Sequence, residues 1–414
     1  MLSRYSSLHP ETSIYTKPAN SAVVYGSLTY VRAQIIMFAR LAMARAVTIA
    51  VRYTCVRKQF QDRDDTSPSA PEVAVLDYPT VQIRILPLLA TAFALHYTGE
   101  EMQRLYWSTR DEINSGNFSR LAVLHSQSSG LKSLCTELAA NSIETCRRAM
   151  GGHGFGGPSG FIQLNNDYLS KPTVEGDNWM ITQQTASYLI KRMAAAVAKK
   201  GEAEDEIEAD CRKYLSEKDG YRTEQLNIFE KDEDIVEAFR RRSRDLTYRA
   251  HVERNERKRS WNSLLIQLRE VSHAESQSIL VQNFHAALTN SPSTSSAGKL
   301  PEILKGHLRT LFRLFAFYTM DASARDFSRA AAVSDSDLDE LSAKVQELMA
   351  EIRPHAVCLV DAWKIPDFLL DSALGRYDGK VYEDLFHRAH RLNPLNEMVA
   401  NPYFWEEESP QMSF

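Results

Sequence analysis

Apolar residues recur every three to four positions over several long stretches of the chain, which is the spacing of one face of an α-helix. The clearest stretch runs from Val31 to Tyr53 and is rich in Ala, Met, Ile and Arg, most of them good helix formers. A second follows from Val81 to Tyr97, and a third from Leu121 to Met150 ends at a pair of glycines. These patterns predict long packed helices.

The helical pattern continues to the end of the chain, whereas strand signals are scarce after residue 30. A helix is predicted from Asp177 to Ala198, and helical patterns return from Ile235 to Ala287 and from Leu300 to Trp363. No internal repeat and no sustained heptad is present. The sequence therefore predicts an all-α fold made of two helical-bundle domains.

A change in composition separates the two predicted domains. Between Lys199 and Glu224 the chain is charged and has few apolar residues, so it marks a boundary or a solvated helix. We therefore predict helical domains over residues 24–198 and 232–404, with a charged linker over 199–231. Residues 290–298 are predicted to form a flexible loop because Ser, Thr, Pro and Gly predominate there.

Charge and cysteine content exclude several classes of protein. The chain carries 49 basic and 53 acidic residues, so no global field favours nucleic acid or an anionic membrane. Five widely spaced cysteines without a CxxC pair argue against a disulfide framework and against a structural zinc site. No apolar run approaches 18 residues, so no membrane span is predicted, and the first 22 residues lack the apolar region of a signal peptide.

A carboxylate beside a glycine precedes the predicted helix that starts at Asp177. Gly176 would let the backbone bring Glu175 close to a ligand, whereas Asp177 and Asn178 are good capping residues for a helix. From the residues alone, an ordinary helix cap and a ligand site both stay open.

A glycine-dense turn, GGHGFGG, occupies residues 151–157. Its backbone N–H groups could approach a phosphate or a planar ring, but it lacks the GK[ST] of a P-loop, and a simple chain reversal is the alternative. His153 has no second ligand at metal-binding spacing. His387 and His390 are interpreted as surface residues of a helix.

Arg57 and Gln59 follow the first long helix. A cation there complements the helix C-terminus, and a guanidinium can also bind a phosphate through two parallel hydrogen bonds. No G-x-S-x-G or comparable nucleophile pattern is present. Spacing alone therefore leaves an α-helical protein whose function is open.

The order and wording of these motifs resemble the acyl-CoA oxidase family over nearly the whole chain. The resemblance rests on seven stretches: YGSLTYVRAQ (25–34), AVRYTCVRKQ (50–59), LDYPTVQIRILPLLATAFAL (76–95), CRRAMGGHGF (146–155), VEGDN (174–178), LGRYDGKVYEDLF (374–386) and NPLN (393–396).

The resemblance implies an FAD-dependent enzyme that converts fatty acyl-CoA to trans-2-enoyl-CoA and reduces O₂ to H₂O₂. Glu175 would be the general base that removes the α-proton while a hydride passes to the flavin. The family binds the thioester oxygen through the backbone N–H of the base and a flavin ribityl hydroxyl. Gly176 would give the substrate room.

The same resemblance implies how the cofactor is held. Arg57 matches the family arginine that reaches the FAD pyrophosphate, commonly across a dimer interface. Gly151, Gly152 and Gly154 match the family's glycine turn, which lies against the nucleotide. Arg148 and Asp177 differ from the Gln and Thr usual in related dehydrogenases, which favours an oxidase. The residues assigned to FAD are Arg57, Gln59, Gly151, Gly152, Gly154, Asp177 and Asn178.

Family members begin with a helical domain and a β-barrel domain, and residues 1–23 resemble the last stretch of that barrel and its linker. Residues 405–414 are assigned to a tail. A homodimer and a peroxisomal location are implied, although the final residues are not the tripeptide address of that compartment. Two alternatives stay open: a catalytically weak paralogue that acts as an interaction subunit, and a dehydrogenase with another electron acceptor.

Overall fold

A computed structural model describes residues 6–17, 22–67, 69–199, 201–221, 226–289 and 301–397. The predicted loop 290–298 and the predicted tail 405–414 lie outside these ranges. Helices dominate the described residues, which confirms the predicted all-α fold class. The only strands among them are the two-residue β1 (Ser7–Leu8) and β2 (Tyr15–Thr16), which pair antiparallel.

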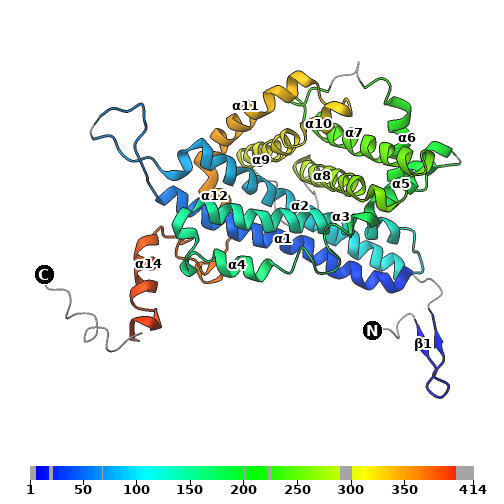
Figure 1. The fold of residues 1–414 in the computed structure, drawn as a ribbon, viewed down its shortest axis with the longest axis horizontal. Coiled ribbons are helices and arrows are strands. Elements are labelled where there is room, and N and C mark those ends of the chain that lie inside the picture. The colour runs from blue at the N-terminus through cyan, green and yellow to red at the C-terminus, as the bar shows by residue number, and fades with distance from the viewer. Residues whose placement is uncertain are drawn as a thin grey trace.

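Three long helices form the first layer (Figure 1). They are α1 (Ala22–Val56), α2 (Pro79–Asn114) and α3 (Leu121–Ala149). Helix α2 runs antiparallel to α1, because the ring of Tyr30 near the start of α1 lies 5.2 Å from that of Tyr106 near the end of α2, and Arg40 contacts His96 midway along both helices. Helix α3 runs parallel to α1, so that the first turns of both helices meet at one end of the bundle and their last turns at the other.

The remaining helices pack above and around this layer (Figure 1). They are α4 (Phe161–Tyr168), α5 (Thr182–Ala198), α6 (Glu206–Glu217), α7 (Asp232–His251), α8 (Leu265–Thr289), α9 (Glu302–Asp321), α10 (Ala324–Arg329), α11 (Asp335–Ile352), α12 (Ala356–Asp361), α13 (Asp367–Leu370) and α14 (Val381–His390). The sequence merged several of these into single long stretches.

One hydrophobic core runs through both predicted domains. Its largest cluster contains buried residues of α1, α2 and α3 together with residues of α8, α9 and α11. Aromatic pairs connect the two halves: the rings of Tyr97 and Phe284 lie 5.2 Å apart, and those of Phe93 and Trp363 lie 4.5 Å apart. The boundaries drawn at 198 and 232 stay predictions, because helix packing is continuous across them.

The charged stretch between the two predicted domains differs from the prediction in one respect. Helix α6 lies within it and is amphipathic, because Cys211 and Tyr214 are buried in a small cluster with Tyr221 and Met193 of α5. Its N-terminus is capped by Asp205, whose carboxylate accepts from the Glu208 N–H at 2.9 Å. Few apolar residues suffice here because a neighbouring helix covers them.

Helix α1 is long and apolar enough to cross a membrane by length and composition, over Thr29–Val56. Of its most apolar window, 72% is buried inside the protein, as in the central helix of a bundle. Packing in the protein interior thus accounts for its hydrophobicity, and the absence of a membrane span stays a prediction.

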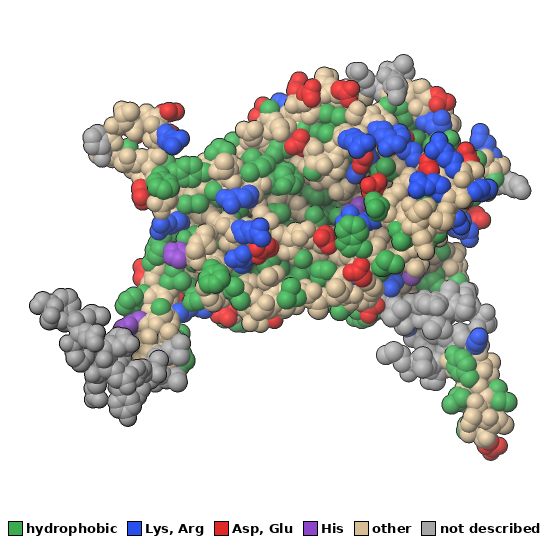
Figure 2. All heavy atoms as spheres, viewed as in Figure 1, with side chains coloured by type: hydrophobic (Ala, Val, Ile, Leu, Met, Phe, Trp, Pro, Cys, Tyr) green, Lys and Arg blue, Asp and Glu red, His purple; other side chains and the backbone are tan. Residues whose placement is uncertain are grey.

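Surface charge is mixed on the face of the molecule that Figure 2 shows. Figure 2 shows Lys and Arg side chains gathered over the end of the molecule that carries α5, α6 and α7, with acidic side chains between them. Ion pairs such as Arg249–Asp245 at 2.5 Å and Arg212–Glu208 at 2.5 Å neutralise part of this charge. The expectation that no nucleic acid binds stays a prediction.

The C-terminal segment folds back onto the end of α1. Arg52 of α1 donates to the Gly375 carbonyl at 2.7 Å and pairs with Asp361 at 2.8 Å. This buried guanidinium fixes the chain that leads to α14, which stands at the end of the bundle in Figure 1. The last helix is thereby brought beside the residues that follow α1.

Candidate active site

The segment from Pro172 to Asn178 is a closed loop between α4 and α5. The Asn178 N–H donates to the Pro172 carbonyl at 3.0 Å and closes it. Inside the loop Glu175 has a φ of 58° and Gly176 a φ of 107°. A non-glycine residue in the left-handed region is uncommon and costs free energy, so the surroundings must hold Glu175 in this conformation.

Gly176 is required by both conformation and space. A Cβ at this position would lie 3.1 Å from the side chain of Ile181, in addition to the strain of the positive φ. The structure thus explains the glycine through the tight turn of the chain. Its predicted role in giving the substrate room stays a prediction.

The helix predicted to begin at Asp177 begins instead at Thr182. The Asp177 carboxylate accepts from the Trp179 N–H at 2.9 Å, so it caps a turn that precedes the helix. The backbone at Asn178 is used to close the loop, which keeps residues 177–181 out of the regular helix. The interpretation of Asp177 and Asn178 as caps of this helix is therefore wrong: Ile181 is its N-cap residue, and Asp177 caps only the preceding turn.

Asn178 is buried, with 4% of its surface exposed, and all its polar atoms are used inside the protein. Its side-chain oxygen accepts from Lys132 Nζ at 2.9 Å. Its amide nitrogen donates to Thr136 Oγ1 at 3.0 Å and to the Glu137 carboxylate at 3.2 Å. Asn178 therefore anchors the loop to α3.

Two buried cations lie beneath the loop. Arg32 of α1 donates through Nε and Nη2 to the Glu175 carbonyl at 3.2 and 3.1 Å. Lys132 of α3 donates through Nζ to the Gly176 carbonyl at 2.7 Å and to the Pro172 carbonyl at 3.0 Å. Burial lowers the pKa of Lys132 to about 8, and it also lowers the pKa of Arg32.

The Glu175 carboxylate is the unengaged group of this loop. It is half-buried and makes no hydrogen bond or ion pair with any residue of the described ranges. The same segment exposes three apolar side chains: Val174, Met180 and Trp179, the last 57% exposed. The Arg269 guanidinium lies over the Trp179 ring, 3.9 Å from its centroid. A half-buried carboxylate without a hydrogen-bond or ion-pair partner in the described residues suits a base.

The second group of predicted residues lies at the far end of α1. The Arg57 guanidinium donates to the Tyr382 hydroxyl at 2.9 Å and to the Gln59 side-chain oxygen. The Tyr53 hydroxyl is hydrogen-bonded to His153 Nδ1 at 2.5 Å, and the rings of His153 and Tyr382 lie 6.3 Å apart. These contacts bring Arg57, Gln59 and the glycine turn into one cluster, and Arg57 turns to Tyr382 rather than capping α1.

The glycine turn presents bare backbone beside this cluster. A Cβ at Gly151, with a φ of 61°, or at Gly152 would meet nothing within 4 Å. Gly154 differs, because a Cβ there would lie 2.1 Å from the Arg147 carbonyl oxygen at the end of α3. Open backbone at two glycines next to a guanidinium fits the pyrophosphate and nucleotide of FAD.

The two groups are far apart within one chain. Arg32, which binds the Glu175 carbonyl, and Val56, which precedes Arg57, are 24 residues apart in the continuous helix α1. At a rise of about 1.5 Å per residue this corresponds to about 36 Å. The residues predicted to hold one cofactor therefore gather at two opposite ends of the bundle.

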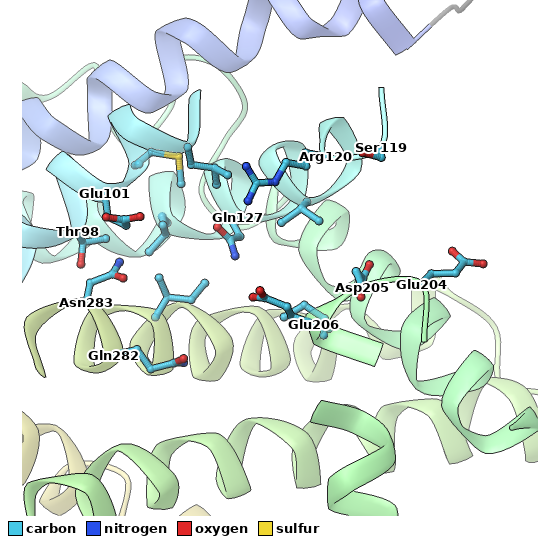
Figure 3. A pocket seen from close by; sticks show the side chains of 16 residues that line it. Thr98, Glu101, Ser119, Arg120, Gln127, Glu204, Asp205, Glu206, Gln282 and Asn283 are labelled. Carbon is cyan, nitrogen blue, oxygen red and sulfur yellow. The ribbon is translucent and has the colours of Figure 1, made fainter. Parts of the chain in front are cut away.

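A separate cleft of ≈ 470 Å³ opens between α2, α3, the start of α6 and α8 (Figure 3). Gln127, Asn283 and Glu206 point into it, and Met102 and Ile279 also line it. None of the predicted site residues lines this cleft. It lies across α3 from the Glu175 loop, because Gln127 and Leu131 face the cleft, whereas Lys132 binds the loop and Ser129 binds Arg32, which also binds the loop.

The residues of these clusters that were not predicted from the sequence include Arg32, Lys132 and Tyr382. Lys132 carries one available signal, since it lies on a helix face of small hydroxyl residues that includes Ser129, Ser133 and Thr136. A long cation among small side chains points to a buried role. His387 and His390 are exposed, as interpreted, and the described residues contain no cluster of three or more metal-ligating side chains.

Two family models match the chain. The model described as acyl-CoA oxidase, C-alpha1 domain, matches residues 25–190, and the model described as acyl-CoA oxidase matches residues 231–412. The chain belongs to the acyl-CoA oxidase family. The resemblance seen in the motifs is thereby confirmed.

The sequences of named relatives are similar to this chain over its whole length. Peroxisomal acyl-coenzyme A oxidase 1 of Rattus norvegicus is 31% identical, and the match covers 100% of the chain and 62% of that relative. The protein of the same name from Arabidopsis thaliana is 32% identical, covering 99% of the chain and 60% of the relative. The chain thus spans about three fifths of the length of such oxidases.

Solved structures of the family share the fold. Arabidopsis thaliana acyl-CoA oxidase 1 superimposes with a TM-score of 0.85 at 32% identity, covering 98% of the chain and 60% of that structure. Acyl-CoA oxidase-1 of Caenorhabditis elegans, in complex with FAD and ATP, gives a TM-score of 0.84 at 27% identity, covering 99% and 59%. The helical bundle described above is therefore the bundle of this family.

Proposed function

We propose that this chain forms the helical, base-bearing part of a peroxisomal FAD-dependent acyl-CoA oxidase. The reaction converts fatty acyl-CoA to trans-2-enoyl-CoA and O₂ to H₂O₂. The supporting relatives are named peroxisomal acyl-coenzyme A oxidases, and solved members of the family contain FAD. Glu175 is the proposed general base.

The observation that carries this proposal is the state of Glu175. The backbone carbonyls of its loop and the Asn178 side chain are bound inside the protein, whereas its carboxylate has no hydrogen-bond or ion-pair partner in the described residues and belongs to a segment with exposed apolar side chains. A carboxylate with few competing hydrogen bonds accepts a proton from a weakly acidic C–H more readily. A purely structural acidic residue would be paired or fully solvated.

The backbone of the loop supports binding of the thioester. In the described part of the chain the N–H groups of Glu175, Gly176 and Asp177 donate to no protein acceptor. Such N–H groups can bind the thioester oxygen as negative charge develops on it after the α-proton leaves. Glu175 would then hold that proton.

The second cluster supports binding of the cofactor. FAD, when bound, supplies the acceptor for the hydride that leaves the β-carbon. Arg57 would bind the pyrophosphate, and Gln59 and Tyr382 orient its guanidinium. Gly151 and Gly152 would let the nucleotide approach the backbone.

The separation of about 36 Å along α1 supports a dimer. One ligand that needs both the Glu175 loop and the Arg57 cluster would draw them from two chains. A two-fold pair that places the Arg57 end of one chain at the Glu175 end of its partner completes two equivalent sites. Asp177 and Asn178 would contribute by holding the loop at the flavin.

The test measures H₂O₂ formation from fatty acyl-CoA by the purified chain supplied with FAD. We expect Glu175→Gln to lower the rate on the order of 10³-fold while FAD binding persists. Asp167→Asn is the matched control, because it changes an exposed carboxylate of the neighbouring helix α4 that contacts Gln163, and it should retain most activity. An active Glu175→Gln variant would refute the assignment of the base.

A second candidate, an interaction subunit of a longer oxidase, is favoured by a different observation. Helix α1 is mostly buried, yet Tyr30, Val31, Phe38 and Leu41 are exposed along it. Such side chains are suited to contact with another protein surface. Co-purification with a full-length oxidase and no flavin spectrum of the chain alone would select this candidate.

A further inference from the structure

Cations from two different helices bind the backbone carbonyl groups of the loop around Glu175. Arg32 of α1 binds the Glu175 carbonyl through two nitrogens, and Lys132 of α3 binds the Gly176 and Pro172 carbonyls. Lys132 is 0% exposed and Arg32 is 8% exposed. The turn is therefore held from below at three of its carbonyl groups.

Neither cation forms an ion pair with a residue of the described ranges. The Lys132 ammonium has three oxygen acceptors, all neutral: the two loop carbonyls and the Asn178 side chain. Arg32 also contacts only neutral groups besides the loop, at His125 and Ser129. A buried ammonium without a counterion is costly, and an apolar or amide side chain would fill this space at a lower cost.

The direction of the held carbonyls determines the direction of the free N–H groups. In a trans peptide the C=O of one residue and the N–H of the next point in opposite directions. Because Arg32 binds the Glu175 carbonyl, the Gly176 N–H points away from Arg32. Because Lys132 binds the Gly176 carbonyl, the Asp177 N–H points away from Lys132.

We propose that Lys132 and Arg32 are positioning residues of the proposed reaction, which hold Glu175 in its left-handed conformation and turn the loop N–H groups toward the substrate side. The proposal rests on the proposed function, since it explains how the base is presented. Neither residue touches the reacting atoms. Their role is exerted through the Glu175 and Gly176 carbonyls.

The competing explanation is that Lys132 only packs α3 against the loop. A substitution at Thr136 distinguishes this explanation from the proposed positioning role. Thr136 is fully buried one turn after Lys132, and it joins the same network through the Asn178 amide. It contacts none of the loop carbonyls that Lys132 holds. Thr136→Val therefore disturbs the packing of the network without releasing the Glu175 turn.

The experiment compares the wild-type chain, Lys132→Met and Thr136→Val by amide hydrogen exchange and by steady-state kinetics. We expect Lys132→Met to speed exchange in peptides that cover residues 170–181 at least about tenfold, with other helices unchanged. In the presence of FAD and fatty acyl-CoA, kcat should fall on the order of 10²-fold with KM within about threefold. Thr136→Val should leave both the exchange of this segment and kcat near the wild-type values.

Lys132→Gln is the second variant, because its uncharged amide retains two N–H donors and keeps the fold if Lys132→Met does not. Unchanged exchange of residues 170–181 in both Lys132 variants would overturn the proposal, as would a full kcat in a variant with a loosened segment. An equal effect of Thr136→Val would also overturn it in favour of packing. A wild-type chain that oxidises no acyl-CoA would count against the proposed function, and the exchange comparison would still decide whether Lys132 holds the loop.

Discussion

The polar clusters at the two ends of α1 differ in burial and in the parts of the chain that form them. At the Glu175 end the contacts are buried and come from α1, α3 and the loop itself. At the Arg57 end the groups are half-exposed, and Arg57 depends on Tyr382, which is 325 residues away in the sequence. The first end is therefore a rigid part of the core, whereas the second is completed by the C-terminal segment. Loss of a polar side chain should therefore lower the stability at the first end and the cofactor affinity at the second.

The largest effect is expected from Asn178→Leu at the Glu175 end. This change removes acceptors and donors from Lys132, Thr136 and Glu137, and it should lower the free energy of unfolding by about 3 kcal/mol. Denaturant unfolding followed by circular dichroism measures it. The neighbouring Asp177→Asn should stay within about 0.5 kcal/mol of wild type, and equal losses in both would contradict the buried network.

The glycine turn at the Arg57 end gives the next effect. Gly154→Ala should cost about 2 kcal/mol of stability, because its Cβ would lie 2.1 Å from the Arg147 carbonyl oxygen. Gly152→Ala meets nothing within 4 Å and should leave stability within about 0.5 kcal/mol while weakening FAD binding. Thermal unfolding and a flavin titration of both variants test this pair. A stable Gly154→Ala protein would show that the turn relaxes freely.

A smaller effect is expected from Tyr382→Phe. The lost hydrogen bond to Arg57 is worth about 1 kcal/mol, so the Kd for FAD should rise about fivefold with unchanged stability. Quenching of flavin fluorescence measures the affinity. Tyr377→Phe, which changes an exposed tyrosine in the same C-terminal segment, is the control. An unchanged Kd in Tyr382→Phe would mean that Arg57 needs no support from α14.

The smallest effect concerns pH and Lys132. Burial and Arg32 lower the pKa of Lys132 to about 8 from 10.5, although Asp177 and Glu175 oppose this shift. Between these pH values the unfolded chain binds a proton that the folded chain lacks, so stability should rise with pH relative to Lys132→Met. The turnover rate should fall over the same range, as the neutral amine loses one donor. Melting temperatures at several pH values measure the first trend, and parallel curves for both proteins would exclude it.

The periodicity of apolar residues was sufficient to predict the long helices, because a regular apolar face determines which side of a helix packs against the core. It failed at Asp177, because the side chain of a capping residue does not reveal whether a turn or a helix follows. The motif order led to Glu175 and Arg57, but not to the separation of about 36 Å between the two ends of α1. Lys132 and Arg32 were missed because their role depends on which backbone carbonyls they bind in the folded chain. The spacing of residues along a helix does not predict those contacts.

The length of α1 has a genetic consequence. A chain that carries Glu175→Gln retains an intact Arg57 end, and a chain that carries Arg57→Gln retains an intact Glu175 end. In a two-fold pair formed from one of each, the two lesions fall into the same composite site and the other composite site is wild type. Two inactive alleles expressed together would therefore complement one another, up to half the activity per mixed pair.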